Sequence, residues 1–248
     1  MVKRTLLSFL ALAAWAGPAA ADPAAVAAAL AAPDRPAADT ARDADRRPAA
    51  LIAFAGIAPG QTVADIMPGG GYFTRIFSRL VGPAGHVDAV IPAEILQVAP
   101  KAADATRAIA AAAGYANVAV VVSPAADLTM PAPVDVAWTS QNYHDVYGFD
   151  GPAAAAAFDA AVFRMLKPGG TFIVIDHAAA PGSGDLPEKT LHRIDPAIVK
   201  AQVTAAGFVL VGESDVLRNP ADDHTLKVFD PAIRGHTDQF ALRFRKPG

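Results

Sequence analysis

Residues 62–81 read TVADIMPGGGYFTRIFSRLV, and this stretch decides the fold. It begins with a short apolar and β-branched run at residues 62–67 and passes through a glycine-rich turn at residues 68–71. Apolar side chains then recur at helical spacing and share one face: Phe73, Ile76, Phe77 and Leu80. A strand, a glycine turn and an amphipathic helix in this order predict the first half of a βαβ unit.

Short strand-like runs recur along the chain and alternate with helical segments, which is typical of a parallel sheet. We expect strands at residues 62–67, 86–91, 118–122, 134–140, 171–176, 208–214 and 239–245. The helix before the fifth strand ends in a Lys-Pro-Gly-Gly turn at residues 167–170. A later helix is framed by Asp195 as its N-cap and Gly207 at its end.

The start of the chain predicts export. Residues 1–21 carry Lys3 and Arg4, then an apolar run, then three alanines ending at Ala21, which is the pattern of a cleaved secretory signal peptide. No later apolar run reaches the roughly 20 residues that a membrane helix needs. We therefore expect cleavage after Ala21, no membrane insertion afterwards, and a periplasmic or secreted protein.

Composition excludes several classes of function. The chain has 248 residues, of which 53% are hydrophobic and none is cysteine, so disulfide scaffolds, thiol nucleophiles and cysteine zinc sites are excluded. A formal charge of −3 without any basic run argues against a broad nucleic-acid surface. The expected partner is a small-molecule substrate, and the oligomeric state is left open.

Two regions are expected after the signal peptide. Residues 22–50 are rich in Ala, Pro, Asp and Arg, contain one helical run, and predict an N-terminal helical arm packed on the larger domain of residues 51–248. The arm carries a charged cluster: Arg42, Asp43, Arg46 and Arg47. This cluster is either a solvated face or a grip for an anionic ligand.

The functional site is expected where the parallel strands end, because ligands bind outside their carboxyl ends. The glycine turn lets a ligand approach the backbone, and the following helix offers free N–H donors. A side chain at Gly71 is expected to block that approach.

Polar side chains follow two further strands and one loop. They are Asn142, Tyr143, His144 and Asp145 after the fourth strand, Asp176 and His177 at the end of the fifth, and His192 in the next loop. We expect them to converge on one rim. Imidazole is the natural general base near neutral pH, and a carboxylate can orient it. The predicted catalytic residues are therefore His144, Tyr143, Asp145 and His177.

The same histidines and carboxylates compose an alternative, a divalent-metal site. No His-x-His or His-x-x-x-His spacing supports it, so the sequence assigns no metal ligands. Asp222, Asp223 and His224 either join the rim or cap a turn.

Several motifs together resemble the class I S-adenosylmethionine-dependent methyltransferases. They are the turn Asp65-x-x-x-Gly69-x-Gly71, the entry to the fifth strand at residues 167–171, and the last strand at residues 239–245. More narrowly, the chain is similar to a group of exported bacterial methyltransferase-like proteins that share four segments. These segments are Pro-Gly-Gly-Gly-Tyr at residues 68–72, Asn-Tyr-His-Asp at 142–145, His-Arg-Ile-Asp at 192–195 and Asp-His-Thr at 223–225.

The resemblance implies an α/β fold of Rossmann-like type. It implies a seven-stranded, mostly parallel sheet in the order 3-2-1-4-5-7-6, with the last strand antiparallel and helices on both faces. It also implies S-adenosylmethionine as cofactor and methyl transfer to a small molecule. The predicted cofactor-binding residues are Asp65, Gly69, Gly70, Gly71, Tyr72, Asp127 and Asn142.

The sequence departs from the family pattern at two positions. Met67 stands where the first glycine of the turn is usual, and Ile91 stands where an acidic residue normally binds the ribose; Glu94 follows three residues later. Exported proteins also lie apart from the cytosol, where S-adenosylmethionine is made. The alternative is therefore a methyltransferase fold that has lost the cofactor and serves as a small-ligand-binding protein, or as a His/Asp hydrolase or lyase with or without a metal.

Overall fold

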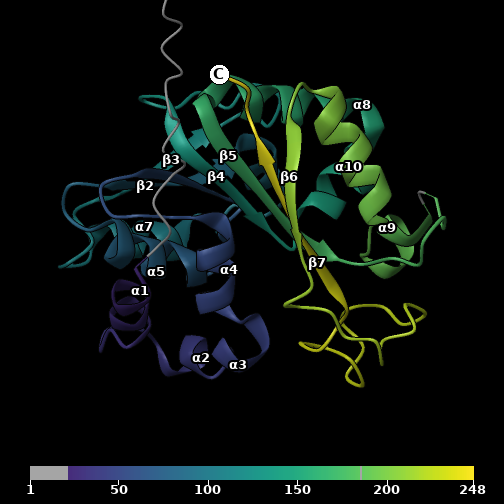
Figure 1. Ribbon diagram of the computed structural model, residues 1–248, viewed down its shortest axis with the longest axis horizontal. Coiled ribbons are helices and arrows are strands. Elements are labelled where there is room, and N and C mark those ends of the chain that lie inside the picture. Colours follow the sequence, from purple (N-terminus) through teal and green to yellow (C-terminus); the bar gives the residue numbers. More distant parts are fainter. Residues whose placement is uncertain (1–21, 185) are drawn as a thin grey trace, which may run out of the picture.

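The fold is a seven-stranded sheet between two layers of helices (Figure 1). It is described by a computed structural model, which covers residues 22–184 and 186–248, so the predicted signal peptide lies outside the described residues. The strands are β1 (Thr62–Ile66), β2 (His86–Pro92), β3 (Val118–Ser123), β4 (Val134–Ser140), β5 (Leu166–His177), β6 (Val209–Ser214) and β7 (Gln239–Arg245). Their order is β3-β2-β1-β4-β5-β7-β6, and only β7 runs antiparallel to its neighbours. The predicted fold class is confirmed.

The register brings the functional strand ends to one edge of the sheet. Asp65 of β1 is level with Trp138 of β4, and Ser140 of β4 is level with Ile175 of β5. The chain leaves β1 toward β2 on one side and returns to β4 on the other. The carboxyl ends of β1 and β4 therefore form the switch point where a parallel sheet opens a crevice.

One helical layer consists of α1 (Pro23–Leu30), α4 (Pro48–Ala55), α5 (Tyr72–Val81) and α7 (Asp104–Ala111). Their buried residues pack in one cluster with alternate strand residues such as Val63, Trp138 and Ile173. The predicted apolar face of α5 is confirmed, since all four of its expected residues are buried there. Trp138 is completely buried, and a side chain of that size stabilises the fold by upward of about 2 kcal/mol.

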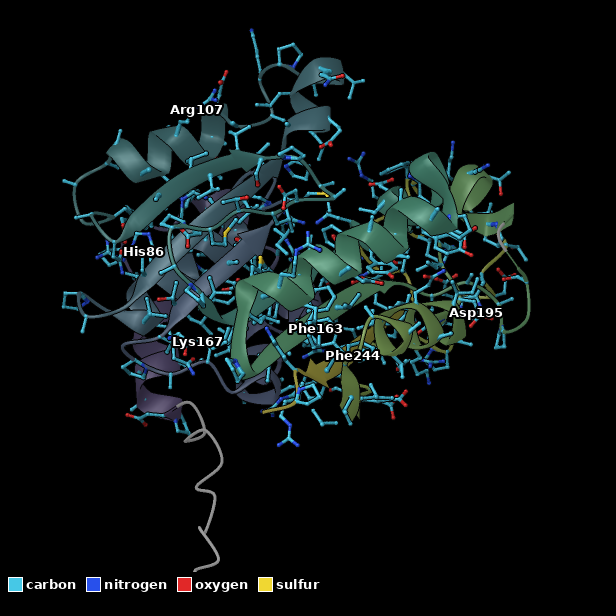
Figure 2. All side chains as sticks on the ribbon, turned by 90° about the horizontal axis from the view of Figure 1, so that it is seen from above. His86, Arg107, Phe163, Lys167, Asp195 and Phe244 are labelled. Carbon is cyan, nitrogen blue, oxygen red and sulfur yellow. The ribbon has the colours of Figure 1, made fainter. Side chains whose placement is uncertain are left out.

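The opposite layer consists of α8 (Tyr143–Met165), α9 (Leu186–Leu191) and α10 (Pro196–Ala205). Figure 2 shows this layer from above, with Phe163 near the end of α8 and Asp195 just before α10. Gly151 has φ 85° and breaks α8 in two before Pro152. Asp195 caps α10 as predicted, because its carboxylate accepts from the N–H of Ala197.

The N-terminal arm wraps from the α5 layer to the strand ends. After α1, the short helices α2 (Ala37–Thr40) and α3 (Asp43–Arg46) lie at the lower edge in Figure 1, on the same side as the loop of residues 215–238. His236 of that loop lies 3.4 Å from Asp45 of α3. The predicted arm boundary at residue 50 falls inside α4, whose Leu51 and Ile52 belong to the core of the domain.

The remaining helix, α6 (Ala93–Val98), follows β2 at the edge of the sheet. In the part of the chain that the structure describes, no helix has both the length and the apolar character needed to cross a membrane.

Candidate active site

The glycine turn is built on left-handed backbone. Met67, Gly69 and Gly71 have φ of 54°, 56° and 78°. A left-handed conformation costs a residue with a Cβ about 1–2 kcal/mol, which explains why glycine is usual at the first of these positions. Met67 is held there by two contacts, since its N–H donates to the carbonyl of Val90 at 2.9 Å and its carbonyl accepts from Asn142 Nδ2 at 3.1 Å.

The three glycines of the turn are not equivalent. A Cβ at Gly71 would lie 2.2 Å from Cδ1 of Ile109, whereas a Cβ at Gly69 or Gly70 would meet nothing within 4 Å. Gly71 is therefore needed for packing against α7. The backbone open to a ligand is that of Gly69 and Gly70, and the expected effect of a side chain at Gly71 on ligand approach stays a prediction.

A cavity of about 240 Å³ lies over the turn. Five of the seven predicted cofactor residues line it: Asp65, Gly69, Gly70, Tyr72 and Asn142. The arm closes it from the other side with Asp39, Arg42 and Arg46, and the remaining lining residues are Met67, Pro68, Phe73, Ser140 and Gln141. Larger cavities of about 520 and 530 Å³ open elsewhere, at the amino ends of β2 and β5.

Asp65 gives this cavity a titratable carboxyl. It is buried at the end of β1 and accepts a hydrogen bond from Thr74 Oγ1 at 2.6 Å. Burial raises its pKa to about 7, against the opposing effects of Thr74 and the Arg46 charge. The carboxyl thus changes charge near neutral pH.

Arg46, at the end of α3, extends from the arm toward the residues that follow the glycine turn. Its guanidinium lies 4.4 Å from the ring centre of Tyr72 and 4.7 Å from that of Phe73, and donates to Ser140 Oγ at 3.0 Å. Burial lowers its pKa to about 10, with the charge of Arg42 acting in the same direction. No carboxylate among the described residues forms an ion pair with it. Of the two readings of the charged cluster, the solvated face is wrong for Arg46.

Tyr72 and Asp43 join the arm to the turn. The Tyr72 hydroxyl donates to Asp43 Oδ1 at 2.5 Å, and Arg35 pairs with the same carboxylate at 2.6 Å. Burial opposes the charge of Asp43, but Arg35 and Tyr72 outweigh it and lower the carboxyl pKa. Burial and this hydrogen bond raise the pKa of Tyr72. Tyr72 therefore lines the cavity, and the hydrogen bond from its hydroxyl to Asp43 attaches the arm to the glycine turn.

Asp127 and the end of β2 lie apart from this cavity. Asp127 is exposed and lies 3.4 Å from Arg164, and it is not a lining residue. Ile91 is buried in the sheet and does not line the cavity either. Glu94 is at the start of α6, and its carboxylate accepts from the N–H of Ala125 at 3.1 Å. None of Asp127, Ile91 and Glu94 therefore lines the cavity over the glycine turn.

A second cavity, of about 400 Å³, adjoins the first and shares Arg42, Arg46 and Gln141 with it. The C-terminal loop supplies most of its far wall. Its other lining residues are Asp45, His177, Val228, Phe229, Arg234, Gly235 and Gln239. The lining contains three arginines, Arg42, Arg46 and Arg234, but only one carboxylate, Asp45, so the cavity carries net positive charge.

The predicted convergence of the three rim histidines is confirmed. The ring centre of His144 lies 5.9 Å from that of His177 and 5.5 Å from that of His192. Asp145 also joins them, since its Oδ1 lies 3.2 Å from His144 Nε2 and 3.5 Å from His192 Nδ1.

Asp176, at the end of β5, contacts both His144 and His177. It is completely buried and accepts from the backbone N–H groups of His144 and His177, each at 2.7 Å, and it contacts His144 Nδ1 at 2.8 Å. The carboxylate thereby caps the first turn of α8 across the sheet. The sequence placed Asp176 on the rim but assigned it no role, because nothing local shows that it faces α8.

The buried His144 and the half-buried His177 differ in protonation. Burial opposes the charge of His144, but Asp176 and Asp145 outweigh it and raise the pKa to about 10. Burial lowers the pKa of His177 to about 4 despite Asp176, and the positive charges of His144 and Arg193 add to the effect. Near neutral pH, His144 is cationic and His177 is neutral. His177 Nδ1 bonds Thr237 Oγ1 at 2.7 Å.

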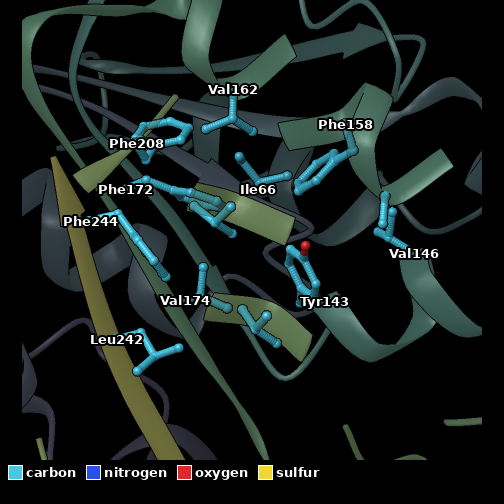
Figure 3. Close-up of a cluster of buried hydrophobic side chains, with 14 of the residues drawn as sticks. Ile66, Tyr143, Val146, Phe158, Val162, Phe172, Val174, Phe208, Leu242 and Phe244 are labelled. Atoms are coloured by element: carbon cyan, nitrogen blue, oxygen red, sulfur yellow. The ribbon is translucent and has the colours of Figure 1, made fainter. Parts of the chain in front are cut away.

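Tyr143 lies in the hydrophobic core and away from the cluster. It is completely buried beside Phe158 (Figure 3). Its hydroxyl donates to Asp159 Oδ2 at 2.8 Å. Burial and the Asp159 charge raise its pKa. Its catalytic role stays a prediction that this position does not favour.

The C-terminal loop is fixed by an ion pair that the sequence did not indicate. Arg193 and Asp222 are both buried and form a bidentate pair at 2.8 and 3.1 Å. His224 Nε2 lies 3.0 Å from Asp238 Oδ2. The contacts of Asp222, Asp223 and His224 therefore stabilise the loop, which agrees with the alternative that they cap a turn. These residues do not join the histidine cluster.

No protein-family model matches the sequence, and no curated protein sequence matches it. Solved structures do match. A S-adenosylmethionine-dependent methyltransferase from Aquifex aeolicus is 19% identical with a TM-score of 0.60, over 90% of this chain and 98% of that one. The CcbJ methyltransferase from Streptomyces caelestis is 17% identical with a TM-score of 0.56, over 84% and 89%.

A third similar structure is the [4+2]-cyclase SpnF, which is 21% identical with a TM-score of 0.57, over 85% of this chain and 81% of that one. At such identities the likeness concerns the fold, which hosts more than one chemistry. The sheet order, the glycine turn at the switch point and these neighbours together give the chain the fold of the class I S-adenosylmethionine-dependent methyltransferases.

Proposed function

We propose that this protein transfers the methyl group of S-adenosylmethionine to a small molecule. The observation that carries the proposal is the pair of adjoining cavities at the switch point. One lies over the open backbone of Gly69 and Gly70, and the other is walled by His177. They share the Arg42 and Arg46 side chains, so two ligands bound there lie next to each other.

The first cavity fits the amino-acid end of S-adenosylmethionine. That end is a zwitterion, and Asp65 and Arg46 offer one group of each charge. Arg46 is half-buried against Tyr72 and Phe73 and has no ion-pair partner among the described residues, so an anion bound in this cavity would supply the missing counter-charge. Asp65 would hold the ammonium group and Arg46 the carboxylate. When bound, the cofactor supplies an electrophilic methyl group on a sulfonium.

The second cavity fits the methyl acceptor. Phe229 is 53% exposed and offers an aromatic wall, while Arg42, Arg46 and Arg234 favour an acceptor that carries negative charge. His177 stands in this wall and is neutral near pH 7. In the tautomer whose Nδ1 donates to Thr237, Nε2 carries the lone pair that would take the proton an acceptor O–H or N–H releases as the new bond to carbon forms. Rate enhancement would come mainly from alignment of the two ligands.

Calorimetric titration of the purified protein with S-adenosylmethionine and S-adenosylhomocysteine tests the proposal. We expect binding in the micromolar range, with one ligand per chain. Absence of heat at millimolar ligand would reject it. Adenosine serves as a matched control, because it has no amino-acid end to engage Asp65 and Arg46.

A second candidate function rests on Ile91, which leaves the end of β2 without a ribose-binding carboxylate. In that case the fold binds an anionic small molecule through its arginines and does not use the cofactor. The same titration separates the two, since this reading gives no binding of either S-adenosyl compound.

We further propose that the protein is exported and acts outside the cytoplasm, on the basis of residues 1–21. N-terminal sequencing of the protein from the periplasmic fraction is expected to begin at Asp22. A cytoplasmic protein that begins at Met1 would reject export. The absence of basic runs supports a small-molecule partner rather than nucleic acid.

A further inference from the structure

We propose that His144, Asp145 and His192 bind a divalent transition-metal ion. One ligand atom from each of the three side chains lies within 4.8 Å of the others. Two imidazole nitrogens and a carboxylate oxygen suit zinc and its first-row neighbours, whereas calcium and magnesium prefer all-oxygen sites. The proposal does not depend on S-adenosylmethionine binding.

The spacing of the ligand atoms fits a metal centre. Asp145 Oδ1 lies 3.2 Å from His144 Nε2 and 3.5 Å from His192 Nδ1. In a tetrahedral shell with metal–ligand bonds of about 2.0 Å, neighbouring ligand atoms are about 3.3 Å apart. Both distances to Asp145 therefore match those around an ion, and the ligand atoms of the two imidazoles lie within 4.8 Å of each other.

His144 is oriented as metal-binding histidines are. Asp176 holds its Nδ1 at 2.8 Å, so the other ring nitrogen, Nε2, faces Asp145. The ring is cationic near neutral pH without an ion, so an incoming ion would displace the proton on Nε2. The carboxylate at Nδ1 then fixes the tautomer that presents Nε2 as ligand and makes that nitrogen a stronger donor. Because Asp176 also accepts from the backbone N–H of His144, the residue is held both at its backbone and at its ring.

His192 is held in a costly conformation. Its φ of 55° is left-handed, which is rare for a residue with a Cβ and accumulates at functional sites. The next residue, Arg193, is locked by its buried pair with Asp222, and the His192 ring packs at 4.9 Å against Phe229. The fold thus fixes this imidazole beside Asp145.

The cluster has an open side. The Asp145 side chain is 39% exposed and that of His192 is 19% exposed, while His144 is buried. Three protein ligands and a free position are typical of catalytic zinc sites and not of closed structural ones. The ring of Phe229, which packs on His192, lines the second cavity, so the cluster lies beside that cavity.

Titration of the untagged, metal-free protein with Co²⁺ and Zn²⁺ tests this proposal. Cobalt in a site of this kind absorbs visible light, and zinc is expected to displace it. We expect one ion per chain with micromolar or tighter affinity. Asp145→Asn and His192→Asn should each weaken binding by about tenfold or more. Asparagine tolerates the left-handed backbone at residue 192, so that variant keeps the fold.

His86→Ala is the matched control, because His86 pairs with Asp88 at the amino end of β2, away from the cluster. It should bind cobalt as the unchanged protein does. The proposal is overturned if the unchanged protein gives no cobalt absorption at stoichiometric metal. It is also overturned if His86→Ala weakens binding as much as His192→Asn does. Circular dichroism of each variant verifies that the fold is intact.

Discussion

The carboxylate of Asp176 holds His144 twice, through the backbone N–H at 2.7 Å and through Nδ1 of the ring at 2.8 Å. One buried residue at the end of β5 thus both caps α8 and orients the imidazole at its first turn. Oδ1 of Asp176 also accepts a hydrogen bond from the backbone N–H of His177, the next residue of β5. Fold stability and site geometry therefore depend on the same side chain.

Asp176→Asn is expected to destabilise the protein strongly. Asparagine offers one accepting oxygen in place of two and leaves the cationic His144 without its buried counter-charge, which costs about 3–5 kcal/mol. Urea unfolding measures the loss in the free energy of unfolding. Asp127→Asn is the control, because the Asp127 side chain is 74% exposed, and it should unfold as the unchanged protein does. Equal stability of both variants would contradict the capping role.

Gly70→Val is expected to weaken cofactor binding without harming the fold. The new side chain enters open space over the turn, and the backbone of Gly70 is not left-handed. Overpacking of about 1–3 kcal/mol lowers the affinity for S-adenosylhomocysteine by roughly 10- to 100-fold. Calorimetry measures the affinity, and thermal unfolding verifies the fold.

Gly71→Ala provides the contrasting variant. Its Cβ meets Ile109 and its φ is 78°, so it should lower the melting temperature. If Gly70→Val binds S-adenosylhomocysteine normally, the cofactor does not lie over this turn.

The sheet could be predicted from the sequence because its signals are local and repeated. The strand β4 has the expected bounds, and Asp195 caps α10 by a contact within two residues. The start of β5 could not be predicted. Leu166 pairs with Val134 across a register shift, which lengthens the strand backward through the Lys-Pro-Gly-Gly turn. That pairing depends on the neighbouring strand and not on the turn residues.

The sequence predicted that the rim histidines converge, but not which neighbouring side chains face the rim and which enter the core. Tyr143 and His144 are adjacent in the sequence, but successive residues of a helix point in different directions, so Tyr143 enters the core while His144 faces the rim. Arg46 is on a helix of four residues, which has no periodicity to show its buried face. Its place between Tyr72 and Phe73 follows from the path of the whole arm.

Asp159 is expected to make stability fall as pH rises. Burial raises its pKa to about 7, and among the described residues its Oδ1 has no hydrogen-bond partner. In the unfolded chain an aspartate ionises near pH 4. The folded state therefore binds more protons between about pH 4 and pH 7, and the free energy of unfolding decreases through that window and then levels off.

Asp159→Asn should remove this part of the pH dependence, because the amide cannot ionise and still accepts from Tyr143. At about pH 8 the variant is expected to be more stable than the unchanged protein by up to about 4 kcal/mol, and near pH 4 the difference should largely vanish. Urea unfolding at a series of pH values measures both curves. Asp65 contributes to each of them equally, so the difference isolates Asp159. Parallel curves would show that Asp159 is ionised in the folded protein.

Arg46→Met separates recognition of charge from packing in the first cavity. Methionine retains an apolar stem against Tyr72 and Phe73 but has no guanidinium to bind a carboxylate. Because a hydrogen bond to a charged group contributes about 1.5–3 kcal/mol, affinity for S-adenosylhomocysteine should fall roughly 10- to 100-fold. Affinity for 5′-methylthioadenosine, which lacks the amino-acid end, should change little. Arg107→Met on the exposed face of α7 should affect neither ligand. An equal loss for both ligands would mean that Arg46 only supports the cavity wall, and the carboxylate would then have to bind elsewhere.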